Sequence, residues 1–175
     1  SIRTGIVGAG FAATFHFECL RKVYGTNVEI EGVFATDTEQ AKVYAKKRGI
    51  RAYESLEKLL DKVDVIHVCT PPVAHEPVAI AALERDMFAI VEKPLTGYFG
   101  DGSDDFNGDT FPKADALDHA LASVERMLAA ERKSKGKILY AENWVYAPSV
   151  QKEREIIEKT GAQILWIHGE EAHSG

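Results

Sequence analysis

The sequence predicts an α/β fold in which helices cover both faces of a doubly wound, mostly parallel sheet. Short apolar runs suited to strands alternate with longer segments of helical periodicity as far as Ala141. A glycine-rich turn, Gly8-Ala9-Gly10, separates the first apolar run from the first helical segment. This order is typical of the opening β–α unit of such sheets.

The first half of the chain contains four expected strands, each followed by a helix. The strands are expected at Thr4–Val7, Val28–Ala35, Ile50–Tyr53 and Val63–Cys69. The first helix, Ala12–Val23, is expected to turn Phe15, Cys19, Leu20 and Val23 inward. Asp37 and Gln40 have the spacing of a capping box, and Gly49 is placed to end the helix that they open. Ser55 is placed to cap the next helix, which runs through Leu60.

The second half begins with a helix through Ala79–Arg85 and a fifth strand at Phe88–Val91. Gly97–Asp109 holds four glycines and four aspartates, which predicts a surface loop. Pro112 suits the first turn of a helix whose apolar positions recur at 4-3-4 spacing, at Leu117, Leu121, Val124 and Leu128. A sixth strand is expected at Ile138–Ala141, then a helix capped by Ser149 and ended by Gly161, then a strand beginning at Gln163–His168.

Composition excludes several classes of partner. The net charge is −6 with a pI near 5.5, which disfavours binding to nucleic acid. No apolar run approaches the length that crosses a bilayer, so no membrane association is expected. Cys19 and Cys69 lack the spacing of metal ligands, and no metal site is expected. We interpret both cysteines as buried small hydrophobes of a cytoplasmic protein.

The glycine turn has the pattern G-x-G-x-x-A. Gly8 permits a tight turn, Gly10 leaves room for a pyrophosphate beside the backbone, and Ala13 lets the helix approach the strand. The N–H groups at the start of that helix would bind the phosphates. The turn therefore favours dinucleotide binding over a purely structural turn.

The identity of the dinucleotide stays open at this stage. Ala35 stands where an acidic residue normally binds the adenosine ribose of NAD, and no arginine beside Thr36 would grip the extra phosphate of NADP. Asp37 either reaches the ribose or caps the following helix. Both NAD and NADP are therefore compatible with Thr36 and Asp37.

Two further motifs follow neighbouring strands, at the edge where open α/β sheets bind ligands. Cys69-Thr70-Pro71-Pro72 and His75 come after the fourth strand, and Glu92-Lys93-Pro94 after the fifth. Together with GIVGAGFAATFH at the first turn and AENWVYAPS at 141–149, these segments resemble the glucose–fructose oxidoreductase, inositol dehydrogenase and MocA (Gfo/Idh/MocA) family. The resemblance covers Ser1–Ser149 and implies a Rossmann-type domain that binds NAD or NADP.

The resemblance also implies roles for individual residues. The phosphate loop would comprise Gly8, Gly10, Phe11 and Ala12. Contacts along the cofactor would come from Thr70, Pro71, Pro72, His75, Glu92, Lys93, Asn143 and Tyr146. Pro72 departs from the family, which commonly has Asn there, and the loop at 97–112 is an insertion. Residues 1–147 would form the cofactor domain, and residues 148–175 would begin a substrate and oligomerisation domain of the α+β class that the chain holds only in part.

Lys93 is the expected catalytic residue. Oxidation of a secondary hydroxyl needs a group that takes its proton, and a lysine partly desolvated beside a positive nicotinamide releases and accepts protons more readily. Glu92 would either orient this lysine or bind the cofactor. The expected activity is hydride transfer to or from a sugar, polyol or related compound, in a homo-oligomer. The alternatives are a redox-assisted glycosidase or epimerase with tightly bound NAD, and a non-catalytic dinucleotide-binding subunit.

Overall fold

The computed structural model of the chain describes residues 1–103 and 105–170. It separates into two compact units, Ser1–Ala141 and Glu142–Gly175. No helix in the described ranges is long and apolar enough to cross a membrane.

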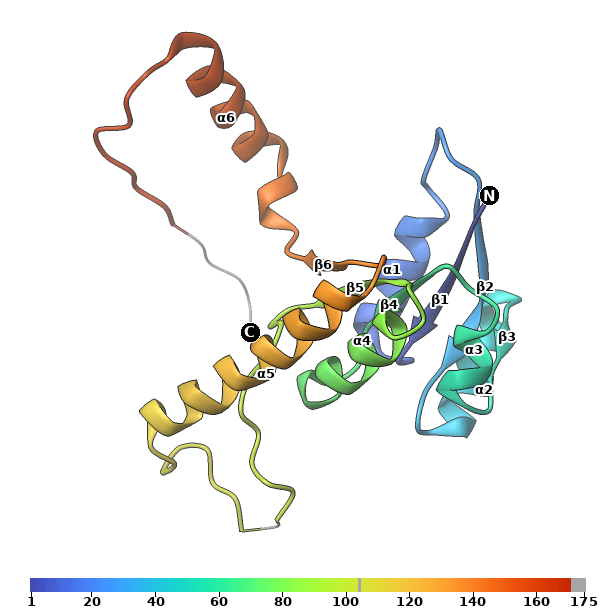
Figure 1. The fold of residues 1–175 in the computed structure, drawn as a ribbon. Helices are drawn as coiled ribbons and strands as arrows, with labels where there is room; N and C mark the ends of the chain where they lie inside the picture. Colours follow the sequence, from blue (N-terminus) through green and yellow to red (C-terminus); the bar gives the residue numbers. More distant parts are fainter. Residues whose placement is uncertain (104, 171–175) are drawn as a thin grey trace. The chain divides into compact units, whose positions relative to one another are not determined.

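The first unit is built on one six-stranded sheet with the strand order β3-β2-β1-β4-β5-β6 (Figure 1). All five strand pairings are parallel. The strands are β1 Ile2–Val7, β2 Val28–Phe34, β3 Arg51–Ala52, β4 Val65–Val68, β5 Phe88–Glu92 and β6 Ile138–Ala141. The order reverses between β1 and β4, which confirms the predicted doubly wound fold.

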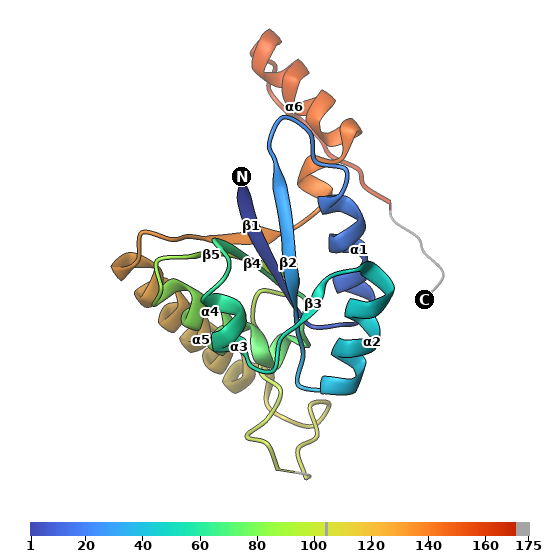
Figure 2. The same cartoon turned by 90° about the vertical axis from the view of Figure 1, so that its right-hand side faces the viewer.

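Helices cover both faces of this sheet (Figure 2). They are α1 Phe11–Leu20, α2 Thr38–Arg48, α3 Leu56–Leu60, α4 His75–Leu83 and α5 Lys113–Lys133, with a short 3-10 helix, η1, at Pro72–Ala74. Ile6 and Val33 pack with α1 and α2 on one face, whereas Ile66 and Val91 pack with α3, α4 and α5 on the other. The core is therefore divided by the sheet into two apolar layers.

Local signals in the sequence account for the ends of two helices. Asp37 caps α2, because its Oδ1 accepts a hydrogen bond from the Gln40 amide at 2.9 Å. Gly49 ends α2 with a left-handed φ of 66°. Ser55 caps α3 by accepting from the Lys58 amide. The predicted caps of these two helices are confirmed.

The predicted inward face of α1 is wrong. Ala13 and Phe17 are buried, whereas Phe15 is 55% exposed and Cys19 is also exposed. Apolar residues surround most of this helix, so their spacing alone does not select a face. The close approach of Ala13 to the sheet selects the face that also holds Phe17, one turn later.

The predicted apolar face of α5 is also wrong. Ser123 and Met127 are buried, whereas Leu117 and Leu121 are 58% and 53% exposed. The helix rests against α4, and the small side chain of Ser123 allows a close approach there. Pro112 precedes the helix as its N-cap and does not lie in its first turn.

The second unit holds a 3-10 helix, η2, at Trp144–Tyr146 and the helix α6 at Pro148–Thr160. Gly161 ends α6 in the left-handed conformation, as predicted, but Pro148 begins the helix in place of a Ser149 cap. Residues 162–170 form no strand. A strand needs a partner for its backbone groups, and the described part of this unit contains no other strand.

Candidate active site at the carboxyl edge of the sheet

The glycine turn lies between the carboxyl ends of three strands. Gly8 follows β1 and donates its amide hydrogen to the carbonyl of Phe34, at the end of β2, at 2.7 Å. Its φ of 106° is a conformation that other residues rarely adopt, and a Cβ here would lie 2.4 Å from the carbonyl oxygen of Cys69, just after β4. Only glycine lets these strand ends come together.

The first turn of α1 begins directly after this turn. No side chain caps it at Gly10, and a Cβ built at Gly10 would have no atom within 4 Å. Ala13 is fully buried, and the Tyr44 hydroxyl donates to its carbonyl at 2.7 Å, which ties α1 to α2. Phe11 is almost fully exposed and Ala12 is half-buried. The arrangement combines a fixed helix start with open space beside it.

Thr70 carries a buried hydroxyl without a partner. The Thr70 Oγ1 atom makes no hydrogen bond to any described residue, at the point where β4 gives way to the loop that faces the glycine turn. A buried hydroxyl without a partner is costly, so a ligand that bonds to it would remove that cost. The open space at Gly10 and this hydroxyl both fit a dinucleotide lying along the strand ends.

Cys69 is buried beside Thr70, as predicted. Burial, with a smaller contribution from the charge of Glu92, raises the pKa of its thiol to about 12. The thiol therefore stays protonated and is no nucleophile.

His75 joins the loops that follow β4 and β5. Its ring is 1% exposed, with Nε2 at 3.0 Å from the Thr70 carbonyl oxygen and Nδ1 at 3.0 Å from the Pro94 carbonyl oxygen. Both ring nitrogens thus face backbone of the two motifs. Pro71 is the N-cap of η1, which begins at Pro72.

Glu92 and Lys93 end β5 beside these loops. The Lys93 side chain is exposed, while its amide hydrogen is donated to Oε2 of Glu92 at 3.1 Å. The other carboxylate oxygen, Oε1, lies 2.8 Å from Nε2 of His16, on α1. Nδ1 of His16 in turn lies 2.8 Å from Nδ1 of His67, on β4.

Sequence reasoning missed this link. Neither His16 nor His67 is among the predicted site residues, but His16 contacts Glu92 directly and His67 is linked to Glu92 through His16. His67 and Glu92 stand 51 and 76 positions from His16 along the chain. The only available signal was register: His16 lies on the first helix, and His67 and Glu92 lie on the two adjacent strands β4 and β5.

The remaining predicted residues occupy two places. Thr36 and Asp37 are exposed after β2, where one oxygen of Asp37 is used by the helix cap. Asn143 and Tyr146 lie at η2 in the second unit, where the Asn143 carbonyl accepts from the Tyr146 amide at 3.0 Å. Their contact with a cofactor stays a prediction.

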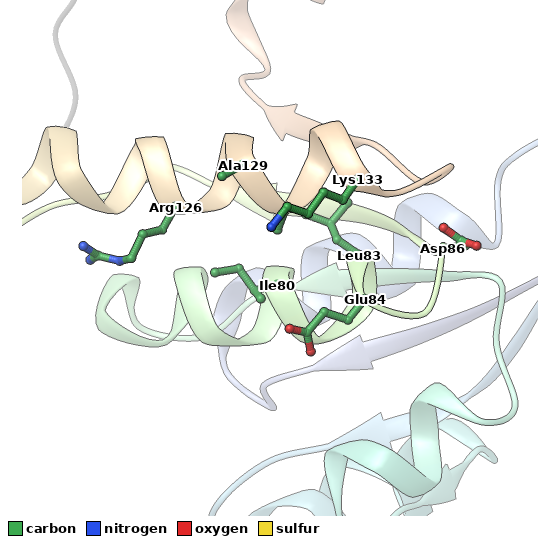
Figure 3. A pocket seen from close by; sticks show the side chains of 8 residues that line it. Ile80, Leu83, Glu84, Asp86, Arg126, Ala129 and Lys133 are labelled. Atoms are coloured by element: carbon green, nitrogen blue, oxygen red, sulfur yellow. The ribbon is translucent and has the colours of Figure 1, made fainter.

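Two of the hollows in the described part of the chain have residues of α5 in their lining. One, of about 370 Å³, runs between α4 and α5 and has Arg126, Lys133, Glu84 and Asp86 at its sides (Figure 3). None of the predicted site residues lines it. The other, of about 220 Å³, lies against the loop at 97–112 and includes Pro72. In this loop the ring of Tyr98 stacks on His119 at 4.2 Å between centroids.

Comparison with known proteins places these features in a family. Residues 2–104 match the oxidoreductase family with an NAD-binding Rossmann fold. The chain is 33% identical over 95 residues to UDP-N-acetylglucosamine 3-dehydrogenase of Acidithiobacillus ferrooxidans, which covers 54% of this chain and 29% of that protein. It is 31% identical over 99 residues to an inositol 2-dehydrogenase of Corynebacterium glutamicum, covering 55% and 29% respectively.

A solved structure shares the fold. The WlbA dehydrogenase of Bordetella pertussis, solved with NADH and UDP-GlcNAcA, superposes with a TM-score of 0.72 at 19% identity. The alignment covers 91% of this chain and 40% of that one, so the chain spans less than half the length of this structural relative. The family match extends over more than half of the chain, from β1 into the loop at 97–112. The chain belongs to the Gfo/Idh/MocA oxidoreductase family, of which it carries the NAD-binding Rossmann domain.

Proposed function

We propose that the chain forms the cofactor-binding half of an enzyme that transfers hydride between NAD or NADP and a secondary hydroxyl or carbonyl of a sugar, polyol or related compound. One observation carries the proposal: the glycine turn, Thr70 and the Glu92-Lys93 pair meet at the carboxyl edge of the sheet, where the strand order reverses. The relatives are named as dehydrogenases of a nucleotide sugar and of inositol, which supports this substrate class.

The residues around the glycine turn bind the dinucleotide. The uncapped amides at the start of α1 receive the pyrophosphate, beside the open space at Gly10. The Thr70 hydroxyl gains a partner from the bound cofactor. Thr36 and Asp37, after β2, are the proposed contacts of the adenosine ribose, and the contacts of Asn143 and Tyr146 with the nicotinamide follow from the family resemblance alone.

Lys93 handles the proton of the reacting hydroxyl. The nicotinamide ring, when bound, accepts or donates hydride at its C4 atom. During oxidation of the alcohol, the side-chain amine of Lys93 takes the hydroxyl proton as the carbonyl forms, and during reduction it returns that proton. The exposed side chain of Lys93 at the end of β5 can reach a substrate on the open side of the site.

A separate role is proposed for the C-terminal residues. Residues 148–175 begin a substrate domain, through which the whole protein forms a homo-oligomer. The substrate is a small molecule, with no nucleic acid or membrane partner. The two unpaired cysteines suit the cytoplasm.

The first test is calorimetric titration of the chain with NAD⁺, NADH, NADP⁺ and NADPH. Micromolar binding of one oxidised and reduced pair is expected and decides between the two cofactors. If none of the four binds to a chain that circular dichroism shows to be folded, the proposal is wrong.

The second test replaces Lys93 in the full-length protein. Lys93→Met is expected to lower kcat/KM by about 10²–10⁴-fold with little change in dinucleotide affinity, because only proton transfer is lost. Lys22→Met, an exposed lysine remote from the strand ends, is the matched control. Equal activity of the two variants would remove Lys93 from the mechanism.

Tightly held NAD without net redox turnover would instead favour the glycosidase or epimerase alternative, and cofactor binding without any activity would favour a non-catalytic subunit.

A further inference from the structure

Three side chains form a continuous hydrogen-bonded array from the end of β5 into the sheet. Glu92 Oε1 and His16 Nε2 are 2.8 Å apart, and His16 Nδ1 and His67 Nδ1 are also 2.8 Å apart. The two rings meet edge to face, with centroids 5.1 Å apart at 79°. The array links α1, β4 and β5, and so connects the helix of the glycine turn with the strand that carries Lys93.

The array is shielded from solvent. The side chains of His16 and Glu92 are 11% and 17% exposed, and His67 is buried. In such surroundings a hydrogen bond is stronger than in water, and a polar group without a partner is costly. Each of the three residues therefore needs its neighbour.

The distribution of protons follows from the two contacts. An ionised carboxylate only accepts, so Nε2 of His16 carries a proton and donates it to Glu92. A bond between two imidazole nitrogens needs one proton between them. Burial, and then the charge of His16, lower the pKa of His67 to about 3, so His67 is neutral near pH 7. When His16 is neutral, Nδ1 of His67 is the donor; when His16 is charged, His67 accepts.

Glu92 is held at both carboxylate oxygens. Oε1 faces His16, and Oε2 accepts the amide hydrogen of Lys93 at 3.1 Å. The carboxylate is thus fixed by His16 on one oxygen and holds the backbone amide of Lys93 with the other. Of the two roles considered for Glu92, orientation of Lys93 or contact with the cofactor, this geometry favours orientation.

We propose that His16 is a positioning residue of the active site, which fixes the Glu92 carboxylate, and through it the Lys93 backbone, by a hydrogen bond that the buried His67 orients. The effect on catalysis rests on the proposed hydride-transfer function, whereas the array itself does not. A displacement of about 1 Å at a reacting group can cost on the order of 100-fold in rate. His16 therefore acts on the turnover step without touching substrate.

The array is tested directly by nitrogen NMR of the histidine rings in the chain at pH 7. Scalar coupling between Nδ1 of His16 and Nδ1 of His67 is expected, with one proton shared between them. His16→Gln is expected to abolish the coupling. Two rings that show no coupling and independent tautomers in the folded wild-type chain would overturn the array.

The positioning role is tested by kinetics of three variants of the full-length protein. His16→Leu removes both hydrogen bonds and is expected to lower kcat about 10- to 100-fold, with the KM for the dinucleotide within about twofold. His16→Gln places an amide donor near Glu92 and is expected to recover most of kcat. Phe17→Leu, the next buried position on α1, is the packing control and is expected to lose stability but not kcat.

The outcomes separate two failures. If His16→Leu and Phe17→Leu have the same kcat, or if His16→Gln is no better than His16→Leu, the positioning role is wrong. If wild-type protein neither binds dinucleotide nor turns over any hydroxyl or carbonyl compound, the proposed function is wrong. In that case the ring coupling still decides whether the array exists.

Discussion

At the scale of single residues, the two glycines of the first turn have different roles, one in the fold and one in ligand binding. Gly8 has φ of 106° and no room for a Cβ, whereas Gly10 has φ of −91° and open space. Gly8 thus serves the fold, since the strand ends could not meet with a larger residue. Gly10 serves the ligand, because nothing in the described structure prevents a side chain there.

Substitution by alanine should separate these roles. Gly8→Ala is expected to lower the free energy of unfolding by at least about 1–3 kcal/mol of backbone strain, before its clash with the Cys69 carbonyl is counted. Gly10→Ala is expected to change stability by less than about 0.5 kcal/mol but to weaken dinucleotide binding, because the methyl group occupies the space for phosphate. Urea unfolding and calorimetry measure both. Wild-type affinity in Gly10→Ala would place the pyrophosphate elsewhere.

At the scale of elements, the ends of helices were easier to predict than their buried faces. Asp37 and Ser55 cap their helices through contacts within three residues, so the signal is local. The buried faces of α1 and α5 depend on what packs against them, and the exposed Leu117 shows that apolar spacing alone does not reveal it. The link of His16 to Glu92 spans the sheet and leaves no local signal at all.

The cap of α2 gives a prediction at this scale. Asp37→Ala is expected to lower the free energy of unfolding by about 1 kcal/mol, because the Gln40 amide loses its acceptor. Asp37→Asn keeps a carbonyl oxygen there and is expected to unfold at nearly the wild-type urea concentration. If both variants lose the same stability, the negative charge at the helix N-terminus matters more than the hydrogen bond. The affinities of the two Asp37 variants for NAD and NADP test separately whether Asp37 contacts the adenosine ribose.

At the scale of the whole molecule, the class of fold was predictable and the arrangement of the site only in part. Alternation of strands and helices, with the turn at Gly8, fixes a parallel sheet, and the motifs after β4 and β5 must then meet at one edge. Which side chains touch there depends on the register of β4 against β5, where His67 lies opposite Ile90. That register is a property of the assembled sheet.

Burial of His67 in this sheet links the stability of the whole unit to pH. Its pKa is lowered from 6.5 to about 3, mainly by burial and then by the charge of His16. In the unfolded chain His67 therefore binds a proton near pH 6.5, whereas in the folded chain it binds one only near pH 3. The contribution of His67 to the free energy of unfolding is fully present above pH 6.5. It is lost as the pH falls from 6.5 towards 3, by up to about 1.4 kcal/mol for each pH unit.

The paired carboxylates Asp64 and Glu76 affect stability at lower pH than His67 does. Hydrogen bonds from Arg3 and Arg126 lower the pKa values of Asp64 and Glu76 below their ordinary values of 3.8 and 4.5, so their contributions are lost only as the pH falls below that range. Between pH 6.5 and 4.5, the difference in urea unfolding between the wild type and a His67 variant therefore reports on this ring. His67→Gln is expected to flatten the stability curve in this interval and to leave the steeper loss at lower pH. If the curves of stability against pH were parallel for the variant and the wild type, the ring would be protonated in the folded sheet. The assignment of a neutral His67 in the hydrogen bond with His16 would then be wrong.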